Sequence, residues 1–291
     1  MADFKTLTTV ARPTWCPGCG NFGIWNGLKR AIEKLGLDPK DIVIVGGVGC
    51  SGQIPNWVGT YGFHGLHGRA LPEAQGIRLA NTTLTVIAAG GDGDGYGEGT
   101  NHLVHACRRN VKITYLVHNN GVFGLTKGQA SPTAPHGYVT RASPFGVHEH
   151  ELNPLALMIA SGASFVARSF AGDLDHLRDT ICEAVRHPGF AIVDILQPCV
   201  TFNKLYTYDY FQKRIYKISA DEKGRGKHDC TDKVAALTRS LEWGDAGIPI
   251  GILYKEVRPT FESELPQIKN APIVAKDMTK IDIKTIVEKY Y

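Results

Sequence analysis

The sequence lacks the features that mark membrane proteins and nucleic-acid-binding proteins. It has no apolar run approaching the ~18 residues that a membrane-spanning helix requires, and its first residues do not resemble a signal peptide. The net charge is only +4, from 32 basic and 28 acidic residues, and no long basic run is present. The composition therefore predicts a soluble cytoplasmic protein that uses neither a membrane nor nucleic acid.

The seven cysteines do not suit a disulfide framework. Their number is odd, and a chain of 291 residues that is 43% hydrophobic can bury one sizeable core without covalent cross-links. Reduced thiols or metal thiolates are therefore the better interpretation. The cysteines are Cys16, Cys19, Cys50, Cys107, Cys182, Cys199 and Cys230.

Short apolar runs rich in β-branched residues alternate with amphipathic helical patterns along the first 200 residues. Helical periodicity fits segments near 24–35, 103–107 and 174–185, and Asn153 and Asp173 are candidate N-caps. This alternation predicts an α/β domain over residues 1–200, built on a doubly wound parallel sheet. The predicted strands are 42–48, 84–89, 113–117, 165–167 and 191–196.

The regular alternation of strand and helix patterns ends after about residue 200. Residues 206–216 are rich in Tyr, Phe and charge, and residues 221–227 are polar and predicted to form a loop. One more helix is expected over 232–243 and one more strand over 250–254. We therefore predict that residues 201–291 form an irregular C-terminal extension that packs on the core or on a partner.

Polar and metal-binding residues follow four of the predicted strands. Ligands of parallel sheets bind beyond the carboxyl ends of the strands, so these residues are expected to meet at one rim. In strand order they are Cys50; Gly91, Asp92 and Gly93; Asn119 and Asn120; and Cys199.

The Gly-Asp-Gly segment and the Asn pair offer hard oxygen ligands. With 25 residues between Gly93 and Asn119, the chain can return beside its starting point. The Asp92 carboxylate and the Asn120 amide oxygen would then suit Mg²⁺, which commonly bridges to phosphate oxygens. The spacing resembles the thiamine-diphosphate motif, which adds the Val122 carbonyl as a third Mg²⁺ ligand. Gly91, Gly93 and Asp94 are expected to bind the cofactor in the same loop. The alternative is a glycine-rich turn in which Asp92 caps a helix.

Two of the cysteines, Cys16 and Cys19, form a Cys-x-x-Cys pair with no strand before it, unlike a thioredoxin motif. We interpret the pair as half of a ligand set completed by Cys50 and Cys199. Four thiolates can hold zinc or an iron–sulfur cluster, and ligands that are single and far apart in sequence are less typical of zinc. Spacing alone leaves both metals open. The other three cysteines are expected to be inert.

Six motifs, in this order, resemble the beta subunit of 2-oxoacid:ferredoxin oxidoreductases, most closely those that act on 2-oxoglutarate. They are WCPGCGN, VGCSGQ, HGLHGRA, GGDGDGYGEG, NNGVFGLTKGQASPT and QPC, between about residues 13 and 201. The resemblance implies the fold of thiamine-diphosphate-binding (PP-type) domains, with thiamine diphosphate and Mg²⁺ as cofactors. It also implies one 4Fe–4S cluster, on Cys16, Cys19, Cys50 and Cys199, and so favours iron–sulfur over zinc.

The activity implied by this resemblance is oxidative decarboxylation of a 2-oxo acid to an acyl-CoA. Coenzyme A is the acyl acceptor, ferredoxin takes the electrons, and the reaction can also run in reverse as a carboxylation. The chain is expected to be active only with an alpha subunit, in an (αβ)2 assembly. That subunit would supply the pyrimidine-binding domain and the glutamate that activates the cofactor.

Two further residues are candidate catalytic groups. Lys127 follows the expected Mg²⁺ ligands, and its ammonium could pair with the distal carboxylate of 2-oxoglutarate to give succinyl-CoA; the alternative is a solvated loop lysine. The resemblance places His67 near the cofactor, and Cys50 between the cofactor and the cluster; a hydrogen-bonded turn histidine is the alternative for His67.

Other functions remain as alternatives to this interpretation. Pyruvate is the second candidate substrate. A non-oxidative thiamine-dependent decarboxylase or carboligase would share the Asp92 and Asn120 module but would need no thiolate quartet. A zinc-stabilised binding or scaffold subunit, with a decayed cofactor site, would need neither thiamine diphosphate nor an iron–sulfur cluster.

Overall fold

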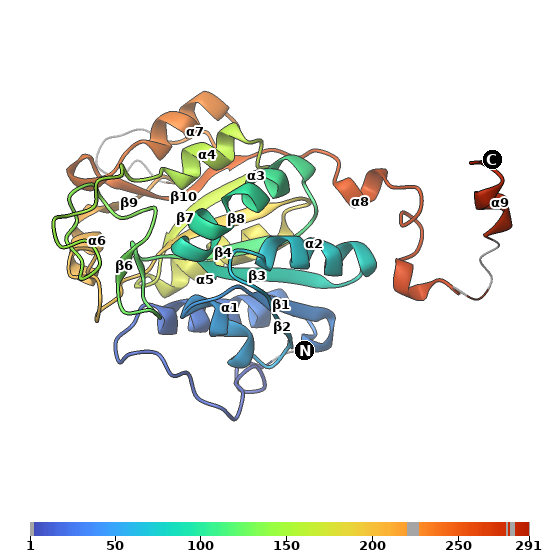
Figure 1. The fold of residues 1–291 in the computed structure, drawn as a ribbon, viewed down its shortest axis with the longest axis horizontal. Helices are drawn as coiled ribbons and strands as arrows, with labels where there is room; N and C mark the ends of the chain where they lie inside the picture. Colours follow the sequence, from blue (N-terminus) through green and yellow to red (C-terminus); the bar gives the residue numbers. More distant parts are fainter. Residues whose placement is uncertain (1–2, 220–226, 278, 280–282, 291) are drawn as a thin grey trace.

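The computed structural model describes residues 3–219, 227–277, 279 and 283–290. Its centre is an eight-stranded sheet in the order β2-β1-β3-β4-β8-β7-β10-β9, with helices on both faces (Figure 1). The strands are β1 (Ile42–Gly46), β2 (Tyr61–His64), β3 (Thr85–Gly91), β4 (Thr114–Asn119), β7 (Phe165–Phe170), β8 (Ala191–Leu196), β9 (Ile215–Lys217) and β10 (Ile248–Lys255). A separate hairpin pairs β5 (Val122–Phe123) with β6 (Gln129–Ala130).

The doubly wound α/β prediction is confirmed, since all strand pairs of the main sheet are parallel except β10 with β7. The central strands β1, β4, β7 and β8 are buried along their whole length, which explains their continuous apolar sequences. The sequence did not predict β2, because this edge strand has four exposed residues and no buried face.

Two helical layers enclose the sheet. One core lies between the sheet and the pair α1 (Asn21–Leu35) and α5 (Leu174–Arg186), and the opposite core lies under α2 (Ala70–Ala80), α3 (Thr100–Arg109), α4 (Pro154–Ala160) and α7 (Lys233–Ser240). The first layer is tight, since a Cβ on Gly27 of α1 would lie 2.9 Å from the Leu177 side chain. Asn153 and Asp173 cap α4 and α5 as predicted, each accepting a backbone N–H three residues on.

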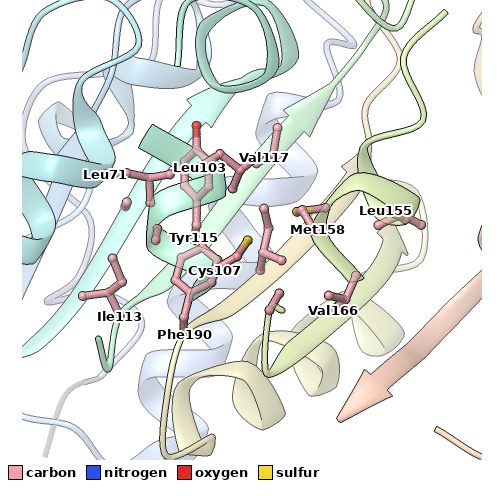
Figure 2. Packing of buried hydrophobic residues seen from close by; sticks show 14 of the residues in the cluster. Leu71, Leu103, Cys107, Ile113, Tyr115, Val117, Leu155, Met158, Val166 and Phe190 are labelled. Carbon is pink, nitrogen blue, oxygen red and sulfur yellow. The ribbon is translucent and has the colours of Figure 1, made fainter. Parts of the chain in front are cut away.

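Two of the cysteines predicted to be inert lie inside these cores. Figure 2 shows Cys107 of α3 packed among labelled core side chains that include Tyr115 and Phe190. Burial raises the pKa of the Cys107 thiol to about 12, so the thiol stays protonated at neutral pH. Cys182 of α5 is 1% exposed and packs in the opposite core. Both behave as small apolar side chains.

The last third of the chain contributes β9 and β10 to the sheet and then continues as short helices. The predicted strand 250–254 is part of β10, and the predicted helix 232–243 forms as the shorter α7. The aromatic segment contains α6 (Tyr208–Arg214). The short helix α8 (Phe261–Glu264) stays on the body, where the buried Glu262 pairs with Arg78 of α2 at 3.1 Å, and only α9 (Lys284–Val287) lies away from it (Figure 1). Most of the predicted loop 221–227 lies outside the described residues. The division at residue 200 stays a prediction.

None of the helices in the described part of the chain is both long enough and apolar enough to cross a membrane.

Candidate functional site

The site begins where β3 and β4 end side by side. These strands are parallel neighbours, with Gly91 opposite His118. Asp92 follows β3 directly and leads into a short π-helical segment, η3 (Gly93–Glu98), and Asn119 is the last residue of β4. Parallel pairing therefore brings the Gly-Asp-Gly segment and the Asn pair together, as the spacing predicted.

The Asp92 side chain is almost fully buried and tightly held. Its Oδ2 accepts hydrogen bonds from the Gly121 backbone N–H at 2.8 Å and from the hydroxyls of Ser131 and Thr133 at 2.6 Å each. Burial raises the pKa of the Asp92 carboxyl, and these hydrogen bonds act in the opposite direction. The two hydroxyl residues had no predicted role, although both lie in the NNGVFGLTKGQASPT motif.

A cavity of about 80 Å³ opens beside this carboxylate. Asp92, Asn120, Val122 and His67 line it, together with Cys50. Gly93 must be glycine here, because a Cβ would lie 2.4 Å from the Phe123 ring. A carboxylate, an amide and a backbone carbonyl are a ligand set that suits Mg²⁺, so the residues present fit a metal-bound diphosphate.

Asp94 holds the loops that border this cavity. Its Oδ1 accepts backbone N–H groups from Val48, after β1, and from Gly68, and lies 3.1 Å from the His67 Nδ1. Burial raises the pKa of the Asp94 carboxyl, while these N–H groups lower it. Asp94 therefore joins the end of β1 to the His67 loop.

The four predicted ligand cysteines line a second cavity of about 190 Å³. The sulfur atoms of Cys50 and Cys199 each lie 3.8 Å from the position that a Cβ on Gly124 would take. Burial, followed by the charges of the other three cysteines, raises the pKa of Cys19 to about 12. Thiolates gathered here therefore need a positively charged group between them.

The geometry of the cysteines bears on the choice between zinc and iron–sulfur. Among the described residues, no three His, Cys, Asp or Glu side chains lie close enough together to hold one metal ion. A zinc ion needs all four sulfurs about 2.3 Å from one point. An iron–sulfur cube instead takes each sulfur on a different iron, which spreads the ligands around a larger volume. Four cysteine side chains around one cavity are therefore a donor set that suits a thiolate-bound metal centre of either kind.

The two cavities have a common boundary, which we call the shared wall. It consists of the residues that line both cavities: Cys50, Asn120, Gly124 and Leu125. A group bound to Asp92 and a group bound to the cysteines would therefore be separated by about one layer of side chains. Of the four residues of the shared wall, only Cys50 was predicted to lie between the cofactor and the cluster.

A buried polar chain behind Asp92 was not predicted. The Thr133 hydroxyl lies 2.9 Å from Asn119 Oδ1, and the Asn119 amide donates to Asp194 at 3.0 Å. Asp194 in turn pairs with Arg168 at 3.1 Å. The available signal was a charged residue in the middle of each of two apolar strands, β7 and β8, where burial is costly without a partner.

Lys127 lies at the exposed tip of the β5–β6 hairpin. Its φ is +77°, a left-handed value that is uncommon for a residue with a side chain and that is often found at functional sites. Thr126 lines the cofactor cavity, but the next residue, Lys127, does not.

Comparisons with known proteins fit this geometry. Residues 47–195 match the family model described as "Thiamine pyrophosphate enzyme, C-terminal TPP binding domain", and residues 199–270 match the model for the C-terminal part of the pyruvate ferredoxin oxidoreductase beta subunit. The chain is 49% identical over 261 residues to a 2-oxoacid:ferredoxin oxidoreductase subunit beta of Saccharolobus solfataricus, covering 87% of this chain and 85% of the relative. The chain belongs to the 2-oxoacid:ferredoxin oxidoreductase beta subunits.

Further relatives of this beta subunit have names that refer to 2-oxoglutarate. A 2-oxoglutarate synthase subunit KorB of Archaeoglobus fulgidus is 39% identical, over 76% of this chain and 84% of the relative. A solved 2-oxoglutarate:ferredoxin oxidoreductase from Magnetococcus marinus, with 2-oxoglutarate, coenzyme A and succinyl-CoA bound, superimposes with a TM-score of 0.90. It is 37% identical, and the match covers 100% of the beta subunit described here and 96% of that chain. These findings confirm the predicted family, fold and enzyme class.

Proposed function

We propose that this beta subunit binds thiamine diphosphate, Mg²⁺ and a 4Fe–4S cluster, and that it oxidises 2-oxoglutarate to succinyl-CoA. The shared wall is the observation that carries the proposal, because it sets an oxygen-lined cavity directly beside a thiol-lined one. A non-oxidative thiamine enzyme has no use for the second cavity. A zinc-stabilised scaffold has no use for the first.

In the proposed reaction the carboxylate next to the oxo group of 2-oxoglutarate leaves as CO₂. The remaining acyl group forms a thioester with coenzyme A. Two electrons and one proton are released, and ferredoxin takes the electrons. Thiamine diphosphate supplies the nucleophilic carbon and the cluster supplies one-electron transfer. With electrons of low potential the same reaction also runs in reverse, as a carboxylation of the acyl-CoA.

The protein's own groups would bind and orient the reactants. Asp92, Asn120 and the Val122 carbonyl would hold Mg²⁺, and the backbone at Gly91 and Gly93 would approach the diphosphate. His67 lines the same cavity, with its Nδ1 3.1 Å from Asp94 Oδ1, where its imidazole would approach the bound diphosphate.

The alpha subunit is the proposed partner, since the relatives are named as beta subunits. Leu66 and Leu125 are large apolar residues with exposed fractions of 75% and 51%, next to His67 and at the shared wall. A partner that brings a pyrimidine-binding domain over the cofactor cavity would cover both. The proposed assembly is (αβ)2.

The test is to compare the isolated chain with the chain co-purified with its alpha subunit, both prepared without oxygen. The complex is expected to contain iron and acid-labile sulfide and to reduce ferredoxin with 2-oxoglutarate and coenzyme A, while the isolated chain decarboxylates nothing. Decarboxylation by the isolated chain, or a preparation without iron, would contradict the proposal. A complex that prefers pyruvate would support the second candidate substrate.

Replacing Lys127 by alanine is expected to lower kcat/KM for 2-oxoglutarate by about tenfold to a hundredfold, because a charge-assisted hydrogen bond contributes ~1.5–3 kcal/mol. The value for pyruvate, which has no distal carboxylate, should stay unchanged. The matched control is Lys204→Ala, which removes another exposed lysine whose amine bonds the Val200 carbonyl. Equal losses for both substrates would mean that Lys127 does not select the distal carboxylate.

A further inference from the structure

Gln197 follows β8 directly and lines the cysteine cavity. It is 1% exposed, and its backbone N–H donates to the Asn119 carbonyl at 2.8 Å. The chain packs closely around it, since a Cβ on Gly20 would lie 2.9 Å from the Gln197 side chain. Gln197 is therefore held rigidly, and its amide makes all of its polar contacts inside the protein.

One end of this amide reaches the cysteine cavity. Gln197 Nε2 donates to Cys19 Sγ at 3.3 Å and to the Pro198 carbonyl at 2.8 Å. The Pro198 carbonyl accepts hydrogen bonds and cannot donate, so the nitrogen end of the amide must be the one that faces it and Cys19.

The other end reaches Asn120, which lines both cavities. Gln197 Oε1 accepts from Asn120 Nδ2 at 2.6 Å, and Asn120 Oδ1 accepts from the Val122 backbone N–H at 3.0 Å. Turning either amide over would place two donors or two acceptors against each other. The orientation of Gln197 therefore fixes which way the Asn120 oxygen points.

We propose that Gln197 is a positioning residue that joins the two centres, orienting the Asn120 oxygen for Mg²⁺ while its N–H stabilises negative charge on the Cys19 sulfur. The inference rests on the proposed function, because it assigns Asn120 to the metal and Cys19 to the cluster. Hydrogen bonds to the ligand sulfurs help to set the reduction potential of an iron–sulfur cluster. Residues that orient metal ligands typically contribute about tenfold to a hundredfold to metal affinity.

Gln197→Met keeps the length of the side chain and removes both hydrogen-bonding ends. In the complex with the alpha subunit, we expect the cluster's reduction potential, measured by an anaerobic redox titration, to become more negative. We also expect the Mg²⁺ concentration that half-saturates thiamine diphosphate binding to rise by about tenfold. A purely structural role would leave the potential of an intact cluster unchanged.

Gln197→Glu separates the two effects and serves if the methionine variant does not fold. It keeps an oxygen for Asn120 but has no N–H for Cys19, so the potential should fall while Mg²⁺ affinity stays near wild type. Gln53→Met is the matched control, since Gln53 lines the same cysteine cavity but bonds Thr14 at 3.3 Å.

An unchanged potential in both Gln197 variants, or an equal shift in Gln53→Met, would overturn the inference. Absence of iron or thiamine diphosphate from the wild-type complex would instead overturn the proposed function.

Discussion

Replacing Asp92 by asparagine is expected to weaken Mg²⁺-dependent binding of thiamine diphosphate by more than about a hundredfold and to abolish 2-oxo acid oxidation. Changes to residues that merely support a metal ligand cost about tenfold to a hundredfold in affinity, so the loss of the one charged ligand should cost more. The asparagine has the same size, and its amide oxygen can take the place of Oδ2 and accept the Gly121 N–H and the hydroxyls of Ser131 and Thr133. The fold should therefore survive. Isothermal titration of the complex measures the loss.

The matched control for this variant is Asp232→Asn. Asp232 caps α7 by accepting the N–H groups of Val234 and Ala235, and asparagine caps helices about as well. This variant should bind the cofactor as the wild type does. If Asp92→Asn also binds it normally, the side chain of Asp92 serves only to bond Gly121, Ser131 and Thr133, and the proposed metal site is wrong.

Replacing Cys199 by serine is expected to remove the cluster while leaving thiamine diphosphate binding in place. Cys199 is 8% exposed and its sulfur faces the same position beside Gly124 as the sulfur of Cys50. Serine is a poor ligand for iron compared with a thiolate, so iron and acid-labile sulfide should fall below half of the wild-type content. Electron transfer to ferredoxin should then be lost.

Cys182→Ala provides the comparison for this cysteine. Cys182 of α5 is buried, its sulfur lies 3.8 Å from the Ala31 carbonyl of α1, and it lines neither cavity. Its removal should leave iron content unchanged and cost only a little packing. Iron content that survives in Cys199→Ser but falls in Cys182→Ala would contradict the assignment of the ligand set.

The sequence was sufficient to predict the layered fold and to predict that Asp92 and Asn120 meet at one cavity. Continuous apolar strands separated by helical patterns favour a parallel sheet, and parallel strands end at one edge, so residues that follow neighbouring strands must meet. For the same reason Cys50 and Cys199 were expected at that edge. The choice between zinc and iron–sulfur could not be made from spacing, because it depends on how far apart the sulfurs stand.

The roles of Gln197 and of the ion pair between Arg168 and Asp194 could not be predicted in the same way. A glutamine has no fixed partner in sequence, and its function here depends on which atoms two separate loops present to its two ends. Arg168 and Asp194 are charged residues within buried strands, and the sequence does not show that they pair with each other. The edge strand β2 was missed because it buries no apolar face that would give a periodic signal.

The shared wall also limits how this lineage can diverge. Any substitution at Gly124 or Leu125 alters the surroundings of both cavities at once, so few changes there can be neutral. Adaptation to other 2-oxo acids is therefore expected to accumulate in the part of the β5–β6 turn that follows the wall, where Thr126 borders one cavity and Lys127 borders neither. Orthologues with different substrates should thus vary at these two positions while keeping Gly124 and Leu125.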